Sequence, residues 1–260
     1  MRFARLLLSF VLVASLLTPT AAPQTASSPQ AVQYLQRALA ALSASTPTSD
    51  VTLSGSAHYI AGSDDETGTA TLKAVAGASR IDLNLSSGPR SEVVNTSASP
   101  AGTWSGPDGV AHAISFHNLL TDPAWFFPAF PITHGLSSGY VATYVGLETR
   151  DGQAVEHLTV SQTSVLQTPA GALTLAHLSQ MDFFLDSATF LPTAITFNIH
   201  PDNNAGLDIP IEIRFSDYRA VNGVQVPFHV EKYLNNGLIL DLQFQTVTLN
   251  TGLTTGSFSL

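Results

Sequence analysis

The last quarter of the chain is dominated by a two-residue alternation of apolar and polar side chains. Four such runs follow one another, with the apolar members Ile195, Phe197, Ile199; Ile209, Ile211, Ile213, Phe215; Val224, Val226, Phe228, Val230; and Leu238, Leu240, Leu242, Phe244. Because successive side chains of a strand point to opposite faces, each run predicts a strand with one apolar and one polar face. Together the runs predict an antiparallel sheet with a large apolar face that must be covered.

Similar runs, separated by turn residues, occur upstream. They predict strands at 51–61, 69–75, 80–85, 110–114, 140–148, 153–161, 173–178 and 181–185. Residues 62–68 are interpreted as a turn, and 86–109 as a looser region rich in Gly, Pro and Ser. Asp151-Gly152, Asn222-Gly223 and Asn236-Gly237 predict tight hairpins. The fold class that follows is mainly β (β-rich α+β), with about 10 to 12 antiparallel strands.

One amphipathic helix precedes these strands. Ser28 is a suitable N-cap and Pro29 a suitable first helical residue. Val32, Leu35, Leu39 and Leu42 then recur on one face. We therefore predict a helix over 29–42, and elsewhere only a single helical turn at 117–120.

The first residues have the character of an export signal. Arg2 and Arg5 precede an apolar run at 6–17, and small residues follow at 18–22. The run is shorter than the roughly 20 residues that span a bilayer. We therefore expect a signal peptide at 1–24, cleaved between Ala21 and Ala26, with an uncleaved anchor as the alternative. Residues 25–260 are expected to form one soluble, exported, periplasmic domain.

Charge and cysteine content narrow the choice of partners. The chain has 10 basic and 19 acidic residues, and a net charge of −9. An acidic surface repels both phosphate backbones and anionic headgroups, so neither a nucleic-acid partner nor stable membrane insertion is expected. The sequence contains no cysteine. Disulfides are therefore excluded, as is lipid attachment through a cysteine at the cleavage site.

The predicted helix is too small for the predicted apolar face. Ten strands make a sheet about 48 Å wide, whereas the helix is only about 20 Å long and 10 Å across. The sheet must therefore curl, either filling its interior with side chains or enclosing an apolar hollow. Residues 123–131 are densely aromatic, and we interpret this segment as a lid over such a hollow, as a core plug, or less favourably as a membrane contact.

Three segments resemble a known family. They are Asp186–Pro192, Phe215–Pro227 and Tyr144–Glu148, the last before the Asp151-Gly152 turn. With the leader and the helix, they make residues 30–260 resemble the lipoprotein-localization carrier superfamily (LolA/LolB-like) and its outer-membrane lipoprotein-sorting homologues. The resemblance implies a curved half-barrel with the N-terminal helix on its concave face, which shelters acyl chains. It also implies charged residues near the mouth of the cavity, for which Arg80 and Arg90 are candidates by region.

The function expected from these observations is non-enzymatic carriage of a lipid or lipoprotein acyl chain, without a cofactor. The predicted ligand-binding residues are Val32, Leu35 and Leu39 on the helix, Phe197, Ile211, Ile213, Phe228, Leu240 and Leu242 on the sheet, and Trp125, Phe126 and Phe127 as the gate. The alternative is an envelope sensing or scaffold protein with a filled interior and an envelope protein partner.

Catalytic and metal chemistry are less favoured by the sequence. Residues 135–139 match the G-x-S-x-G pattern of serine hydrolases, which requires a strand before Ser137 and a helix after it. Residues 140–145 alternate like a strand, so an ordinary turn is predicted and a hydrolase ranks a distant third. The eight histidines are scattered and are expected to be solvated, although spacing leaves sites assembled across strands open. Asp64, Asp65 and Glu66 are interpreted as a solvated turn, and no metal site is predicted.

Overall fold

A computed structural model describes residues 26–43, 47–96, 99–164 and 168–259. The predicted export signal at 1–24 lies outside these residues. Within them, thirteen strands form one antiparallel sheet. The strands are β1 (Asp50–Ala61), β2 (Asp64–Val75), β3 (Ala78–Leu85), β4 (Gly88–Asn95), β5 (Ala101–Ser105), β6 (Ala111–Ala113), β7 (Tyr140–Arg150), β8 (Gln153–Gln162), β9 (Met181–Asp186), β10 (Pro192–Ile199), β11 (Ile209–Val221), β12 (Val224–Leu234) and β13 (Gly237–Leu249).

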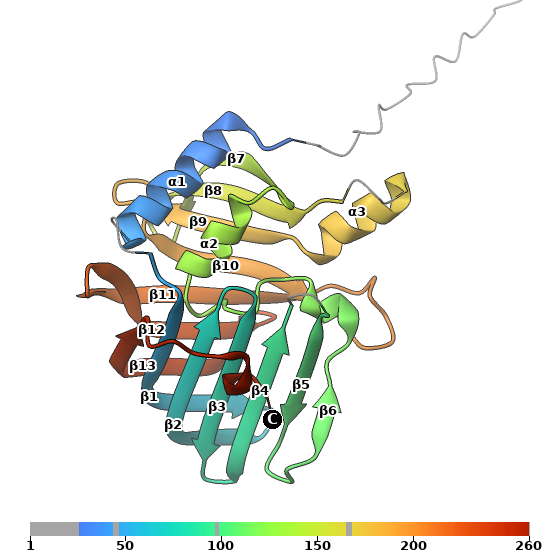
Figure 1. Ribbon diagram of the computed structural model, residues 1–260, viewed down its shortest axis with the longest axis vertical. Helices are drawn as coiled ribbons and strands as arrows, with labels where there is room; N and C mark the ends of the chain where they lie inside the picture. Colours follow the sequence, from blue (N-terminus) through green and yellow to red (C-terminus); the bar gives the residue numbers. More distant parts are fainter. Residues whose placement is uncertain (1–25, 44–46, 97–98, 165–167, 260) are drawn as a thin grey trace, which may run out of the picture.

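The sheet is a curved meander that does not close. Its order is β6-β5-β4-β3-β2-β1-β13-β12-β11-β10-β9-β8-β7, so β1 and β13 pair in the middle while β6 and β7 are the two edges. In Figure 1, β1–β6 fill the lower part of the molecule and β7–β10 cross its upper part. The helices are α1 (Pro29–Ser43), α2 (Ala129–Gly135) and α3 (Pro169–Leu178), with 3-10 turns η1 (Phe116–Leu119) and η2 (Thr255–Ser257). The predicted fold class is confirmed.

The predicted apolar face of the sheet is its concave face. All of the alternating residues between Ile195 and Phe244 are buried in the main core, except Ile199, Ile209 and Leu238 near strand ends. Helix α1 lies on this face, where it contacts α2, β12 and β7 (Figure 1). Its start is capped as predicted, because Ser28 Oγ accepts a hydrogen bond from Ala31 N at 3.2 Å. Leu35 and Leu42 are the largest side chains that α1 buries.

The chain crosses from one sheet edge to the other through residues 114–139. This crossing contains η1, the aromatic segment 123–131 and α2. Phe126 and Phe127 are 0% and 1% exposed and belong to the main core. These two rings therefore fill the interior as a core plug, and the helical turn predicted at 117–120 corresponds to η1.

The chain end packs against the opposite, convex face. Phe258 forms a small cluster there with Ala78 of β3 and Val93 of β4. Asp50, which is 2% exposed, holds the start of this tail by accepting hydrogen bonds from Thr251 N and Gly252 N at 2.8 and 2.9 Å. The tail is the dark red segment that crosses in front of β2–β4 in Figure 1.

Two upstream predictions missed strand residues. The region 86–109 is not loose, because it contains β4 and β5. Only residues 62 and 63 form the turn that was expected to extend to 68, and Asp64, Asp65 and Glu66 begin β2 instead.

Two downstream predictions need a different correction. Residues 173–178 belong to helix α3 rather than to a strand, and this helix begins with the Thr168 N-cap followed by Pro169. The last hairpin turns at Asn235 and Asn236, one residue earlier than predicted, since both have positive φ and Leu234 pairs with Gly237.

Candidate functional site

Two adjoining cavities lie on the concave face towards the β6 edge. Their volumes are about 210 Å³ and about 240 Å³, and four residues line both: Glu92, Trp104, Trp125 and Lys232. The first cavity has mainly apolar walls, to which Tyr59, Ile81, Leu83 and Leu240 contribute. Trp104 is 45% exposed and stacks on His112 with ring centroids 4.4 Å apart, so these rings form the rim.

Lys232 places an ammonium group inside this mainly apolar cavity. It continues the inward-facing series of β12 after Phe228 and Val230. Its Nζ atom lies 4.5 Å from the centre of the Trp125 ring, a cation–π contact. Among the described residues it has no hydrogen-bond or ion-pair partner. Burial lowers the pKa of Lys232, and the attraction of the Glu92 carboxylate only partly opposes that shift.

Arg90 brings a second cation to the wall of the first cavity. Its Nη2 donates to Glu66 Oε1 at 3.3 Å, and its guanidinium lies 4.7 Å from the centre of the Tyr59 ring. The Nε–H of Arg90 is buried and has no hydrogen-bond partner in the described part of the chain. The first cavity is therefore lined by two cationic groups: Arg90 is paired with Glu66 and Asp64, whereas Lys232 has no such partner among the described residues.

Glu66 holds Arg90 in position through a hydrogen bond. The Glu66 carboxylate accepts hydrogen bonds from Ser86 Oγ, Ser87 N and Ser87 Oγ at 2.6–2.8 Å. These bonds hold the pKa of Glu66 down at about 2, so its charge persists through the neutral and mildly acidic range. A fixed anion beside Arg90 orients the guanidinium, because Nη2 donates to it.

Only part of the predicted ligand-binding set lines these cavities. Trp125 lines both, Leu240 the first and Phe197 the second. Other members of the predicted set line neither cavity and are buried in the main core: Leu35, Phe126, Phe127, Ile211, Ile213, Phe228 and Leu242. Val32 and Leu39 are partly exposed on α1. Their roles as ligand contacts stay predictions.

The charged residues of the site were largely missed from the sequence. Arg90 was a candidate by region, whereas Arg80, the other candidate, lies on the convex side, where it pairs with Asp82 at 2.6 Å. Lys232 and Glu92 were not singled out. For Lys232 a signal existed, because the alternation of Val224, Val226, Phe228 and Val230 continues to it in phase.

The hydrolase motif is not built as a nucleophile elbow. Helix α2 precedes Ser137 and strand β7 follows it, the reverse of the order that the motif requires. Ser137 is exposed, and in the described part of the chain its hydroxyl has no histidine partner. A separate hydrogen-bonded series, Ser216 Oγ to His229 Nδ1 at 2.9 Å and His229 Nε2 to Asp241 Oδ1 at 3.0 Å, crosses β11–β13 on the convex face. Neither of the two concave cavities is lined by it.

Comparison with known proteins supports the fold. No protein-family model and no curated protein matches the sequence. A solved outer membrane lipoprotein-sorting protein domain from Vibrio parahaemolyticus is similar, with 14% identity, a TM-score of 0.56, and coverage of 88% of this chain and 96% of that chain. A LolA superfamily protein from Nitrosomonas europaea is 11% identical, with a TM-score of 0.54 and coverage of 88% of this chain and 97% of that chain. A DUF1329 family protein from Desulfovibrio piger is 11% identical, with a TM-score of 0.55 and coverage of 88% of this chain and 96% of that chain.

At these identities the likeness establishes the fold alone. This chain has the LolA-like fold, a mainly β half-barrel with helices on its concave face, as the sequence resemblance predicts. Within the described residues, none of the helices combines the length and apolar character that crossing a bilayer would require.

Proposed function

We propose that this protein is an exported, non-enzymatic carrier that binds the apolar chain of an anionic lipid in its concave cavities. Residues 25–260 would act as a single LolA-like domain after removal of the signal at 1–24. The solved relatives with this fold include a lipoprotein-sorting domain and a LolA superfamily protein, which supports a lipid or lipoprotein cargo.

The observation that carries the proposal is the unpaired Lys232 inside a mainly apolar cavity. Lys232 is partly buried, and an ammonium without a hydrogen-bond or ion-pair partner in such a place is available to a ligand that carries the opposite charge. Arg90, at the same wall, is already paired with Glu66 and Asp64. Glu92 attracts Lys232 while Glu66 and Asp64 pair with Arg90, so the carboxylates around these cations at least balance their charge, and Lys232 Nζ is the cationic donor left for a head group. An apolar chain with a carboxylate or phosphate head fits this combination.

The size of the two cavities limits the ligand that they can hold. Each cavity is smaller than the roughly 300 Å³ at which ligand pockets begin, and the two adjoin at Trp125 and Lys232. A long acyl chain would need both spaces. Each additional buried methylene should then contribute about 0.8 kcal/mol until the joint space is full.

Titration of the purified protein with a fluorescent fatty acid, and with the fatty alcohol of equal length, tests the proposal. Lys232→Met should weaken binding of the acid by about tenfold or more, because a charge-assisted hydrogen bond is lost. Binding of the alcohol should be unchanged. Lys73→Met is the matched control. Lys73 is the other lysine of the chain, and it lies on the convex face of β2, whereas its neighbour Leu72 faces the core.

Two outcomes would count against the proposal. Failure of the wild-type protein to bind either compound would favour the sensing or scaffold alternative, in which an envelope protein partner replaces the lipid. Equal weakening of acid and alcohol by Lys232→Met would show that Lys232 shapes the cavity without recognising a head group.

A further inference from the structure

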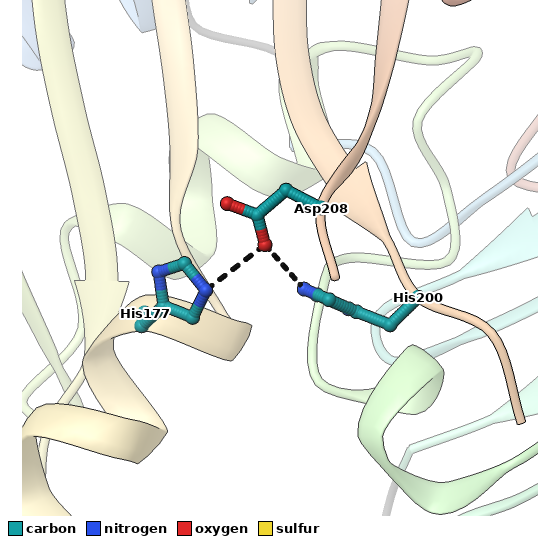
Figure 2. Close-up of side chains that lie close together, drawn as sticks. All are labelled: His177, His200 and Asp208. Atoms are coloured by element: carbon teal, nitrogen blue, oxygen red, sulfur yellow. Dashed lines mark hydrogen bonds and ion pairs between the residues drawn. The ribbon is translucent and has the colours of Figure 1, made fainter. Parts of the chain in front are cut away.

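Three side chains from α3 and the β10–β11 connection converge at the outer end of α3. They are His177 in the last turn of α3, His200 after β10, and Asp208 just before β11 (Figure 2). Asp208 Oδ1 lies 3.0 Å from His177 Nε2 and 3.0 Å from His200 Nε2. One ligand atom from each residue falls within 4.8 Å of the others. Two imidazoles and one carboxylate thus face a common point.

The backbone around His200 is held in place without any help from this cluster. Asn118 of η1 donates from Nδ2 to His200 O and accepts from His200 N at Oδ1, both at 2.8 Å. The His200 side chain is 1% exposed, whereas His177 and Asp208 are 49% and 42% exposed. One ligand is therefore rigid and buried, while two are accessible from solvent.

The protein leaves part of this histidine group unsatisfied. His200 Nδ1 and His117 Nε2 are both buried and have no hydrogen-bond partner among the described residues. The His117 ring stands edge-on to His200, with centroids 5.9 Å apart. Neither atom is the His200 Nε2 that faces Asp208, so an ion bound through Nε2 would leave both nitrogens as they are.

A polar cavity gives access to the same point. It has a volume of about 280 Å³ and is lined by His177 and Asp208 together with Gln180, Asp182, Thr196 and Asn198. Water entering here could complete the coordination of an ion that the three side chains hold. This cavity differs in its lining from the concave cavities, sharing only Phe197 with the second of them.

We propose that His177, His200 and Asp208 form a binding site for a divalent transition-metal ion of the Zn²⁺ class. Two imidazole nitrogens and one carboxylate oxygen are a ligand set that suits Zn²⁺, with a fourth position left to water from the polar cavity. Bond lengths of about 2.0–2.1 Å in a tetrahedral site separate ligand atoms by about 3.3 Å. The 3.0 Å contacts to Asp208 Oδ1 then need to lengthen by only a few tenths of an ångström.

The ion would cross-link two segments of the chain, one of which is already joined to a third through Asn118. It would tie α3 to the β10–β11 connection, and through Asn118 to the crossing that runs between the sheet edges. Binding would therefore stabilise the folded state, since the ligands are brought together only by folding. This site is independent of lipid binding in the concave cavities.

Isothermal titration of the tag-free protein with Zn²⁺, together with its melting temperature with and without Zn²⁺, tests the site. We expect one site per chain and a higher melting temperature with the ion. His177→Ala and Asp208→Asn change exposed ligands, so the variants should fold, and each should lower the affinity at least about tenfold and reduce the melting shift. His229→Ala is the matched control, because His229, Glu231 and Asp241 form the other cluster within 4.8 Å in the described residues.

The result divides cleanly. Loss of binding in His177→Ala and Asp208→Asn but not in His229→Ala supports the site. Absence of Zn²⁺ uptake by the wild-type protein, undiminished uptake by both variants, or loss only in His229→Ala would overturn it.

Discussion

Leu35 of α1 lies against Gly135 of α2 at the point where the two helices meet over the sheet. Its Cδ1 atom is 3.4 Å from the position that a Cβ atom on Gly135 would take, and both Cγ atoms of Val160 in β8 are 3.2 Å from it. All three residues belong to buried parts of the concave face. The absence of a side chain at residue 135 therefore sets how closely α2 approaches α1 and β8.

Gly135→Ala should destabilise the protein. The added methyl group must displace Val160 in a close-packed interior, which typically costs about 1–3 kcal/mol. The midpoint of urea unfolding measures the effect. Gly139→Ala is the control, since nothing lies within 4 Å of the point that a Cβ atom on Gly139 would occupy and a change within about 0.5 kcal/mol is expected. Equal midpoints for the two variants would contradict the packing described here.

Truncation of the aromatic plug should be costly. Phe127 is 1% exposed, and Phe127→Ala should lose about 3–5 kcal/mol through lost burial and the cavity left behind. Phe116→Ala, at a ring 62% exposed in η1, should have little effect on the free energy of unfolding. If Phe127 were a mobile lid rather than part of the core, both substitutions would be mild in the same denaturant titration.

Stability should fall in acid through Glu66. Its pKa of about 2 in the folded protein lies below the value of 4.5 for a free glutamate, so its contribution is present above pH 4.5. That contribution is lost as the pH falls from about 4.5 towards 2, because the unfolded chain then binds the proton more readily. Melting temperatures recorded across this range should fall more steeply for the wild type than for Glu66→Gln. Parallel curves would show that Glu66 contributes nothing to the acid sensitivity.

His134 should act in the opposite sense. The hydrogen bond between His134 Nδ1 and the buried Asp122 carboxylate raises the pKa of His134 against the effect of burial. The raised pKa gives a contribution that is complete below about pH 6.5 and is lost as the pH rises through the folded-state value. The difference in melting temperature between the wild type and His134→Gln should therefore be larger at pH 5 than at pH 9. A difference independent of pH would exclude the charged pair.

The sheet was predictable wherever its inward side chains are apolar. The runs through Ile211 and Phe228 alternate cleanly because one face of those strands is core, and the fold class followed from them. Strand β4 was missed because Arg90 and Glu92, on its inward face, are charged. The same property that places these residues at the cavity hides their strand from a hydrophobic pattern.

The remaining differences arise from contacts between distant residues. Leu173 and Leu175 alternate with polar or small residues, as in a strand. The segment is nevertheless a helix, and it begins with an N-cap and a proline, Thr168 and Pro169, which are typical of a helix start. His177 and Asp208 are 31 positions apart, so their meeting depends on how α3 and the β10–β11 connection pack. The spacing of these residues in the sequence does not reveal that they meet, so the histidines look scattered when only the sequence is considered.

The pairing of β1 with β13 has a consequence for how the molecule is made. Val51 pairs with Leu249 across the centre of the sheet, so the first strand of the sheet to be synthesised must wait for the last one before the two can pair. Until then, β1 and β12 each have an unpaired edge. A chain that ends before residue 237 lacks β13, the strand that joins the two halves of the half-barrel. Such distant pairing slows folding, so the nascent protein would depend on protection from aggregation until its final hairpin arrives.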